Sequence, residues 1–387
     1  MNKNSTIKKM IITALSISLM SMSGMIISPA LNNIELYFNT IDPVYIQMLI
    51  TIPSLFMIPT TLLSDKVIQK FSYKQVYLFC LIVLMCFGSL PLFSKNFIFI
   101  FISRMFVGLS IGLLTPINTA MLTTYLSEEI KPKMLGINSA VESFGGALMV
   151  IVSGFLANIS WDLCFLTYIL SLIPIVLVIF IFDESFNTYQ TFNKEKVKLS
   201  FNKQVMLYTF FICVYMTFFN VYSTKLSTLI IERQFGNTLT SGVATGAFYV
   251  FSFLSGMVFD KINSYFKKHT FSISVLLSAL GIFMLTISYN QTILVLSSVV
   301  CGFSMGILIP AAMNIASFYS TRKQQTFSIS LVLSGSRIGQ FFTTLIYLPI
   351  ASSFNLTTGH TYTFACVGLI ILFLLAFCIE KTSKPLH

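Results

Sequence analysis

Long apolar stretches, separated by short polar loops, follow one another along almost the entire sequence and constrain its fold more than any other feature. We identify twelve, each near the ~20 residues that a helix needs to cross the apolar core of a bilayer. Only 10% of the residues are charged, against about 25% in a soluble domain. Such a chain has too little charge to cover a water-exposed surface, so a soluble enzyme, a disordered protein and a nucleic-acid-binding module are excluded. The sequence predicts an all-α protein that crosses the membrane repeatedly.

The predicted spans cover residues 10–31, 44–64, 74–93, 96–124, 133–158, 162–182, 204–230, 239–259, 269–289, 291–318, 327–351 and 361–379. The first follows three lysines, as a signal peptide would, but removing it would leave eleven spans and unpair the two halves described below. The seven cysteines all lie within apolar stretches, with no CxxC or Cys/His spacing. We therefore expect no disulfide and no metal site.

Basic residues are distributed unequally between the two sides of the predicted membrane. If the N-terminus is cytoplasmic, only Lys95 and Arg233 fall in outer loops, and Arg104, Lys225 and Arg337 lie within spans. All the others fall in cytoplasmic segments, which is the positive-inside pattern of membrane proteins. We expect both termini in the cytoplasm, and we attribute most of the net charge of +11 to orientation rather than to an acidic partner such as nucleic acid.

The sequence contains an internal repeat. A shift of 194 residues superposes identical residues of the two halves: Gly108, Gly112 and Pro116 fall on Gly302, Gly306 and Pro310. The repeat divides the chain into two six-helix halves, 1–182 and 204–387, joined by a polar cytoplasmic linker, 183–203. Parallel repeats about an axis normal to the membrane, with a binding site between them near the midplane, are a transporter architecture.

Several short motifs accompany the repeat. The loop after the second span begins Ser64-Asp65-Lys66, and its counterpart after the eighth span carries Asp260-Lys261. The fourth span contains Arg104 followed by Gly108 and Gly112, and Trp161 to Phe165 follow the fifth span. In these motifs, and over nearly its whole length, the chain resembles the major facilitator superfamily (MFS).

This resemblance implies twelve transmembrane helices in two pseudo-symmetric halves that rock around a central site. It also implies that Asp65, Lys66, Asp260 and Lys261 form gating contacts where helices leave the membrane; the alternative is solvated interfacial charges. The loop departs from the family signature, because Thr61 and Ser72 stand at the positions of two signature glycines. Its spacing resembles the longer variant of drug-efflux relatives. The fifth-helix motif of the proton-driven drug antiporters is incomplete, because Met149-Val150 stand where Gly-Pro would be.

Three charged residues fall near the centres of predicted spans, where a charge costs about 2.5–3.5 kcal/mol. Arg104 and Glu142 reach similar depths, so we expect that they could form an ion pair. Reversible protonation of Glu142 beside Arg104 would couple transport to protons; a static buried salt bridge is the alternative. Arg337 falls opposite Ser143 under the repeat, next to Glu142, and could bind an anionic group, balance Glu142 or serve helix packing. Lys225, near the outer end of its span, is expected to snorkel to the membrane interface.

Polar residues of the first, fourth, seventh and tenth spans would line the central cavity if the resemblance holds: Asn32, Asn118, Asn220 and Asn314. Met20, Met22 and Met25 offer a soft apolar surface for varied ligands, or they pack in the core or against lipid. Two G-x-S-x-G sequences resemble a hydrolase nucleophile motif. They lie within predicted helices without a histidine nearby, so we interpret them as small residues for close helix packing. No nucleotide-binding or metallohydrolase motif is present, and we expect no enzymatic activity.

The sequence therefore predicts a monomeric secondary transporter in a bacterial plasma membrane. We expect proton-coupled efflux of small amphipathic or drug-like molecules, with no cofactor and with the proton gradient as energy source. A transporter for a specific nutrient, sugar or metabolite is the alternative within transport. A non-transporting membrane sensor on the same fold is the alternative from another class.

Overall fold

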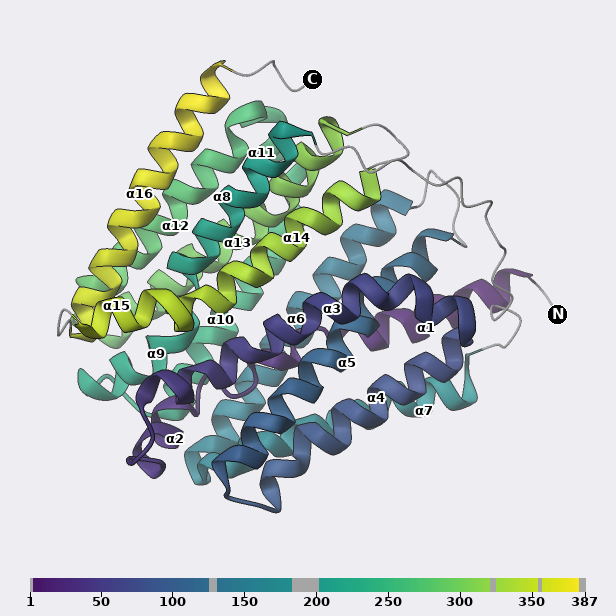
Figure 1. Ribbon diagram of the computed structural model, residues 1–387, viewed down its shortest axis with the longest axis horizontal. Helices are drawn as coiled ribbons and strands as arrows, with labels where there is room; N and C mark the ends of the chain where they lie inside the picture. The colour runs from purple at the N-terminus through teal and green to yellow at the C-terminus, as the bar shows by residue number, and fades with distance from the viewer. Residues whose placement is uncertain (1–2, 125–130, 183–201, 321–324, 354–356, 383–387) are drawn as a thin grey trace.

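The computed structural model describes residues 3–124, 131–182, 202–320, 325–353 and 357–382. These residues form a bundle of helices and contain no strand (Figure 1). The helices of the first half are α1 (Lys3–Ser18), η1 (Ser23–Met25), α2 (Leu31–Tyr37), α3 (Pro43–Lys70), α4 (Tyr73–Ser89), η2 (Leu90–Leu92), α5 (Phe97–Thr124), α6 (Lys131–Ile159), η3 (Trp161–Ser171) and α7 (Leu172–Phe180).

The helices of the second half are α8 (Lys203–Phe219), α9 (Val221–Glu232), α10 (Thr238–Met257), α11 (Phe259–Phe266), η5 (Lys267–His269), α12 (Thr270–Thr286), α13 (Gln291–Phe318), α14 (Gln325–Phe342), η6 (Thr343–Tyr347), α15 (Leu348–Ser353) and α16 (Thr358–Thr382). Polar side chains fix several helix starts. Asp42 accepts a hydrogen bond from the Val44 N–H in front of Pro43, and Ser72 and Gln75 form a capping box.

Eleven helical segments of the described chain are long and apolar enough to cross a membrane. The region of the first predicted span, 10–31, is apolar too, but it is not one helix: α1 ends at Ser18, and turns and η1 precede α2. The prediction of a continuous helix here was wrong. The Ser18 hydroxyl donates to the Ala14 carbonyl in the last turn of α1 (3.0 Å), and Gly24 and Pro29 are poor helix formers. The seventh span is also divided, because α8 ends and α9 begins on either side of Asn220.

Each half has its own apolar core. One cluster of buried side chains runs from Met10 to Phe182, and the second runs from Val205 to Ala376, with Ala147 and Val150 added from α6. The halves meet where α6 packs against α10 and α3 against α14. In Figure 1 the purple-to-blue half and the green-to-yellow half lie side by side. This arrangement places the faces of α6 and α14 between the two cores.

The repeat found in the sequence is also present in the packing. A Cβ atom on Gly108 would overlap the backbone of α3 at Pro53, and a Cβ on Gly302 would overlap the backbone of α10 at Phe248. Gly112 and Gly306 approach the same two helices one turn further along, at Met57 and Ser252. The two G-x-S-x-G sequences therefore bring helices into close contact, which confirms their interpretation as packing motifs.

The bundle has two ends that differ in charge and in packing. At one, which we call the lysine-rich end, α3 finishes with Lys66 and Lys70, and Lys267 and Lys268 precede α12. At the other, which we call the opposite end, lie α2, α9 and α15, toward the lower left of Figure 1.

Every hydrogen bond that joins the halves among the described residues lies in the half of the bundle toward the opposite end. The Ser28 hydroxyl donates to the Ser223 carbonyl (2.8 Å), and the Ser227 hydroxyl donates to the Pro29 carbonyl (2.7 Å). The remaining three join Thr51 to Thr344 (2.6 Å), Ser54 to Gln340 (2.6 Å) and Thr238 to Asn158 (3.4 Å). The halves are therefore fastened to each other at the opposite end.

Candidate functional site

Glu142 lies on α6, the helix of the first half that packs against α10 of the second. Its carboxylate accepts a hydrogen bond from the Asn138 amide, one helical turn away (2.9 Å), and the Ser21 hydroxyl lies beside it. The side chain is partly exposed rather than enclosed. An acid in this position remains reachable from the space between the halves.

A chain of hydrogen bonds inside the first half ends on Glu142. The Tyr77 hydroxyl donates to Asn118 (3.5 Å), and the Asn118 amide donates to the Ser18 hydroxyl (2.8 Å). Ser18 in turn donates to the Asn138 oxygen. These donors can all point toward Glu142, a group that only accepts when it is ionised, and the Ser18 hydroxyl also reaches the Ala14 carbonyl (3.0 Å). This arrangement suits the ionised carboxylate.

Arg337 faces Glu142 from the other half of the molecule. It lies on α14, and its charge acts on Glu142 and on Tyr249 of α10. Within the described chain Arg337 makes no ion pair within 4.0 Å and no side-chain hydrogen bond, and it is partly exposed. The two halves thus present opposite charges that attract each other without contact.

Arg104 does not join this pair, so the proposed Arg104–Glu142 ion pair is not formed. Its side chain is completely buried and donates hydrogen bonds to the Leu49 carbonyl (2.9 Å), the Tyr168 hydroxyl and the Gly24 carbonyl. The sequence-based estimate of depth in the membrane places Arg104 and Glu142 at the same level. Their side chains, however, leave their helices in different directions. A guanidinium can instead use its fork of donors on backbone carbonyls.

The interruption of the first membrane segment explains why such carbonyls are available. Where the helix is broken, carbonyls lose their helical partners and must find others in the low-dielectric interior. Besides Gly24, the Ser23 carbonyl accepts from Tyr168 (2.8 Å), and the Ile26 carbonyl accepts from Ser153. Side chains from α5, α6 and η3 therefore hold the broken segment in place.

The four asparagines predicted to line a cavity lie in different surroundings. Asn118 is buried inside the first half, where it also donates to the Ala14 carbonyl (3.0 Å), and Asn314 is exposed. Asn220 sits at the break between α8 and α9 and donates to the Gln340 carbonyl (3.5 Å). Asn32 is nearly buried, and its amide nitrogen has no hydrogen-bond partner. The structure does not bring these residues together in one place.

The residues predicted to gate the protein lie toward the lysine-rich end. Lys66 and the backbone of Asp65 belong to the last turns of α3 rather than to a loop, and the side chain of Asp65 lies outside the described part of the structure. Asp260 and Lys261 begin a separate short helix, α11, and both are exposed. An acid in the first turn of a helix interacts favourably with the helix dipole. The pseudo-symmetric positions thus differ in local structure.

The methionines of the first membrane segment do not all lie in the same surroundings: one packs in a core, and two face the region between the halves. Met20 is buried in the core of the first half, whereas Met22 and Met25 are partly exposed and pack against the core of the second. Gly146 brings α6 close to the Tyr249 ring, since a Cβ there would lie 3.1 Å from it. Glu142, Arg337, Tyr249, Met22 and Met25 form the central group of residues between the halves.

Sequence reasoning missed two members of this region. Asn138 lies four residues before Glu142, so helical spacing alone could have identified it as a neighbour. Tyr249 comes from the opposite half, and no periodicity within its own helix indicates which residue of α6 it meets. Lys225, which the sequence predicts to snorkel to the membrane interface, lines a cavity between the halves at the opposite end.

Comparisons with known proteins agree with the architecture. The family model described as Major Facilitator Superfamily matches residues 13–231 and 209–387. The Protein TsgA homolog of Buchnera aphidicola is 20% identical and covers 100% of this chain and 99% of its own length. Multidrug resistance protein 1 of Bacillus subtilis is 25% identical, with 96% and 95% covered.

Solved structures with the same fold include the nucleoside transporter NupG, with a TM-score of 0.79 and 11% identity over 96% of this chain and 99% of that one. The xylose transporter XylE from E. coli, in an inward open conformation, has a TM-score of 0.77 and 12% identity over 98% and 97%. These identities are too low to assign the substrates of those proteins to this chain. The family match, however, spans both halves. This chain is a multi-pass membrane transporter that belongs to the Major Facilitator Superfamily, and not an enzyme.

Proposed function

We propose that this transporter exports small amphipathic molecules in exchange for protons, with Glu142 as the proton-binding group. The observation that carries the proposal is the pairing of Glu142 with Arg337, opposite charges on different halves that attract without forming an ion pair. The 25% identity to a Bacillus subtilis protein named for multidrug resistance supports the efflux direction. A protein of this kind needs no cofactor, because the proton gradient supplies the energy.

The orientation follows from the positive-inside rule. If the lysine-rich end lies in the cytoplasm of a bacterium, with both chain termini, then the hydrogen bonds between Ser28 and Ser223 and between Ser227 and Pro29 close the outer side. The structure then corresponds to an inward-facing state of a monomer in the plasma membrane. Asp65 and Asp260, with the lysines that follow them, act at the cytoplasmic side where the halves separate.

Coupling uses the charge on Glu142. When the carboxylate is ionised, it attracts Arg337 across the interface and accepts the hydrogen bond from Asn138. Protonation removes that attraction, so the relative free energies of the two arrangements of the halves change. A substrate that binds better to one arrangement shifts the same equilibrium, and exchange results when proton and substrate favour different states.

The surface around this pair suits ligands with an apolar body and a polar group. Met22 and Met25 supply unbranched, polarizable side chains, and Tyr249 supplies a ring with a polar tip. The alternative is a transporter of a specific polar nutrient or metabolite. Its support is the fold that this chain shares with the nucleoside and xylose transporters. A site for such a solute would need several fixed hydrogen-bonding groups rather than methionines.

Everted membrane vesicles with an established proton gradient test the proposal. Addition of amphipathic compounds from a drug panel should release protons in vesicles that contain the protein and not in vesicles without it. Proton release by a single sugar or nucleoside, with none by amphipathic compounds, would support the nutrient alternative. Ligand binding without flux would identify a sensor and overturn the proposal.

A further inference from the structure

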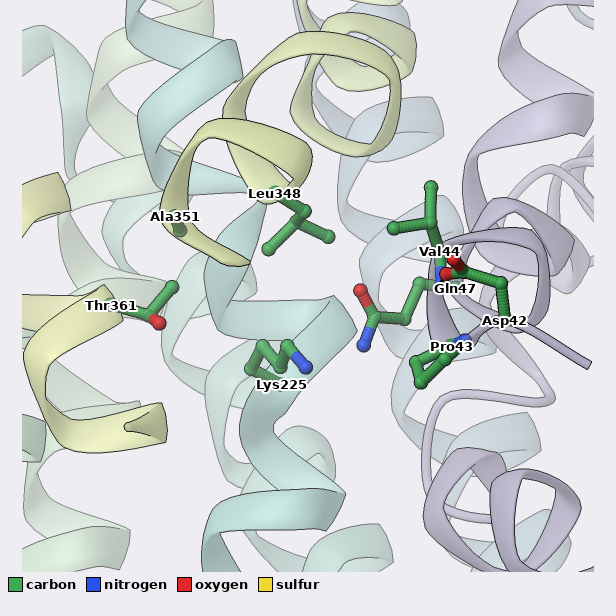
Figure 2. Close-up of a pocket in the computed structure, with 8 residues that line it drawn as sticks. All are labelled: Asp42, Pro43, Val44, Gln47, Lys225, Leu348, Ala351 and Thr361. Atoms are coloured by element: carbon green, nitrogen blue, oxygen red, sulfur yellow. Dashed lines mark hydrogen bonds between the residues drawn. The ribbon is translucent and has the colours of Figure 1, made fainter. Parts of the chain in front are cut away.

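A second group of polar and charged residues lies between the halves at the opposite end, far along the helices from Glu142. Glu35 on α2 and Gln47 on α3 belong to the first half, and Lys225 on α9 belongs to the second. Gln47 and Lys225 line a cavity of about 230 Å³, whose wall also includes Asp42, Leu348 and Thr361. Figure 2 shows the Gln47 amide and the Lys225 ammonium pointing into this cavity from opposite sides.

The polar atoms of this group are incompletely paired. Gln47 is 1% exposed, yet its amide nitrogen has no hydrogen-bond partner, and the same holds for the buried Glu35 Oε2. Lys225 acts on Glu35 through its charge, but the two form no ion pair within 4.0 Å among the described residues. Glu35 as a whole is partly exposed, but a carboxylate oxygen that is shielded from water without a close cation or a donor is costly.

The neutral form of Glu35 fits this environment better. A protonated carboxyl group carries an O–H donor, and rotation of the Gln47 amide would present its oxygen as the acceptor. The charged groups that act on Glu35 are Lys225 and Glu232, both on α9, while Asp42 stands at the start of α3 on the cavity wall. Burial raises the pKa of Glu35 and Glu232 adds to the rise, whereas Lys225 and Gln47 oppose it.

We propose that Glu35 is a second proton-binding site, whose protonation stabilises the closed arrangement of the opposite end. This proposal rests on the alternating access of the proposed function, but it concerns regulation at the outer surface rather than coupling at Glu142. When the halves separate at this end, water reaches Glu35 and its carboxylate is hydrated. The proton therefore binds more tightly to the closed state than to the open one.

The sign of the pH effect follows from that difference. A group whose pKa is higher in the closed state favours closure at low pH, and this contribution is lost as the pH rises through the raised value. Acidification at the opposite end should thus close it, and neutral pH should oppose closure. In a proton-driven exporter, an acidic exterior would then promote the step that carries a bound proton inward.

Distance measurements between spin labels on the full-length protein in nanodiscs test the proposal. We place labels on Thr40 of the first half and Gln291 of the second, both exposed, in a background without the seven native cysteines that retains transport. Between pH 4.5 and 8, the population with the shorter distance should fall as the pH rises. The variant Glu35→Gln should keep the short distance throughout, because its side chain is always neutral.

Two variants on α9 should move the pH midpoint of closure, at which half of the molecules show the short label distance, in opposite directions. They provide matched controls. Lys225→Met removes the charge that favours the ionised form, so the midpoint should move to higher pH. Glu232→Gln removes the repelling charge, and because Glu232 is exposed, its midpoint should move slightly to lower pH.

Glu142→Gln separates this proposal from the proposed function. It should abolish proton-driven transport and leave the pH-dependent closure intact. An unchanged distance in the wild type, or a wild-type pH response in Glu35→Gln, would overturn the role of Glu35. A response that is lost only in Glu142→Gln would assign the pH dependence to Glu142 instead.

Discussion

The Arg104 guanidinium donates a hydrogen bond to the backbone carbonyl of Gly24, within the interruption of the first membrane segment. Arg104 and Gly24 are 80 residues apart, so this contact fixes α5 against the broken segment. Arg104 is therefore a structural residue, which compensates backbone groups that the break leaves unpaired.

Replacement of Arg104 should destabilise the protein. In Arg104→Met the Leu49 and Gly24 carbonyls and the Tyr168 hydroxyl lose a charged donor, and hydrogen bonds to charged groups contribute about 1.5–3 kcal/mol each. We expect a loss of about 3 kcal/mol or more in unfolding free energy, measured as a lower thermal midpoint in detergent. Arg104→Lys should recover part of it, because one ammonium cannot reach all three acceptors.

The same variants test whether Arg104 takes part in coupling. Since Arg104 does not contact Glu142, the pH dependence of transport by the folded fraction of Arg104→Lys should match that of the wild type. The destabilisations of Arg104→Lys and Glu142→Gln should also add in the double variant. A shifted pH profile, or strong non-additivity, would show that Arg104 takes part in proton coupling and would contradict its purely structural role.

The contact between α6 and α10 depends on glycine. A Cβ on Gly154 would lie 2.7 Å from the Gly242 Cα, whereas a Cβ on Gly256 would meet only the Gly306 carbonyl oxygen, at 3.8 Å. Gly154→Ala should therefore cost about 1–3 kcal/mol of stability through backbone displacement. Gly256→Ala, on the partner helix α10, should be neutral or slightly stabilising, because alanine favours the helix. Equal thermal midpoints for the two variants would contradict this account of the interface.

Much of this architecture could be predicted from the sequence. Hydropathy indicates the lengths of the spans, and the repeated glycines indicate close helix packing in each of the two halves. The glycines at 108 and 302 contact related helices, as the repeat required. The break after Ser18 could not be predicted in the same way. It depends on whether distant side chains, such as Tyr168 and Ser153, are placed to satisfy the freed carbonyls, and hydropathy contains no such information.

Hydrogen bonds between Thr51 and Thr344 and between Ser54 and Gln340 should bias the protein toward its present state. Each contributes about 0.5–1.5 kcal/mol, so the double variant Thr51→Val/Ser54→Ala should increase the population that is open at the opposite end several-fold. The Thr40–Gln291 label distance measures this population. Thr209→Val removes a hydroxyl that bonds only within its own helix, so it should leave the distance unchanged. A double variant indistinguishable from this control would show that the closed end does not depend on these contacts.

The candidate site was only partly accessible from sequence. An acid near the centre of a span indicates function because it is costly there, and this reasoning identified Glu142 and Arg337. It also paired Glu142 with Arg104, since depth in the membrane can be estimated from residue number but the direction of a side chain around its helix cannot be fixed without the neighbouring helices. The repeat aligns Arg337 with Ser143, the residue after Glu142, and in the structure the charge of Arg337 acts on Glu142 from the other half.

The central claim is that protonation of Glu142 couples transport to the proton gradient. Proteoliposomes containing the wild type should accumulate an amphipathic substrate against its concentration when a proton gradient is imposed. Glu142→Gln keeps the size of the side chain and an oxygen for the Asn138 hydrogen bond, but it cannot exchange a proton. We expect it to lose gradient-driven accumulation while retaining downhill substrate exchange. Accumulation by Glu142→Gln at the wild-type level would contradict the account.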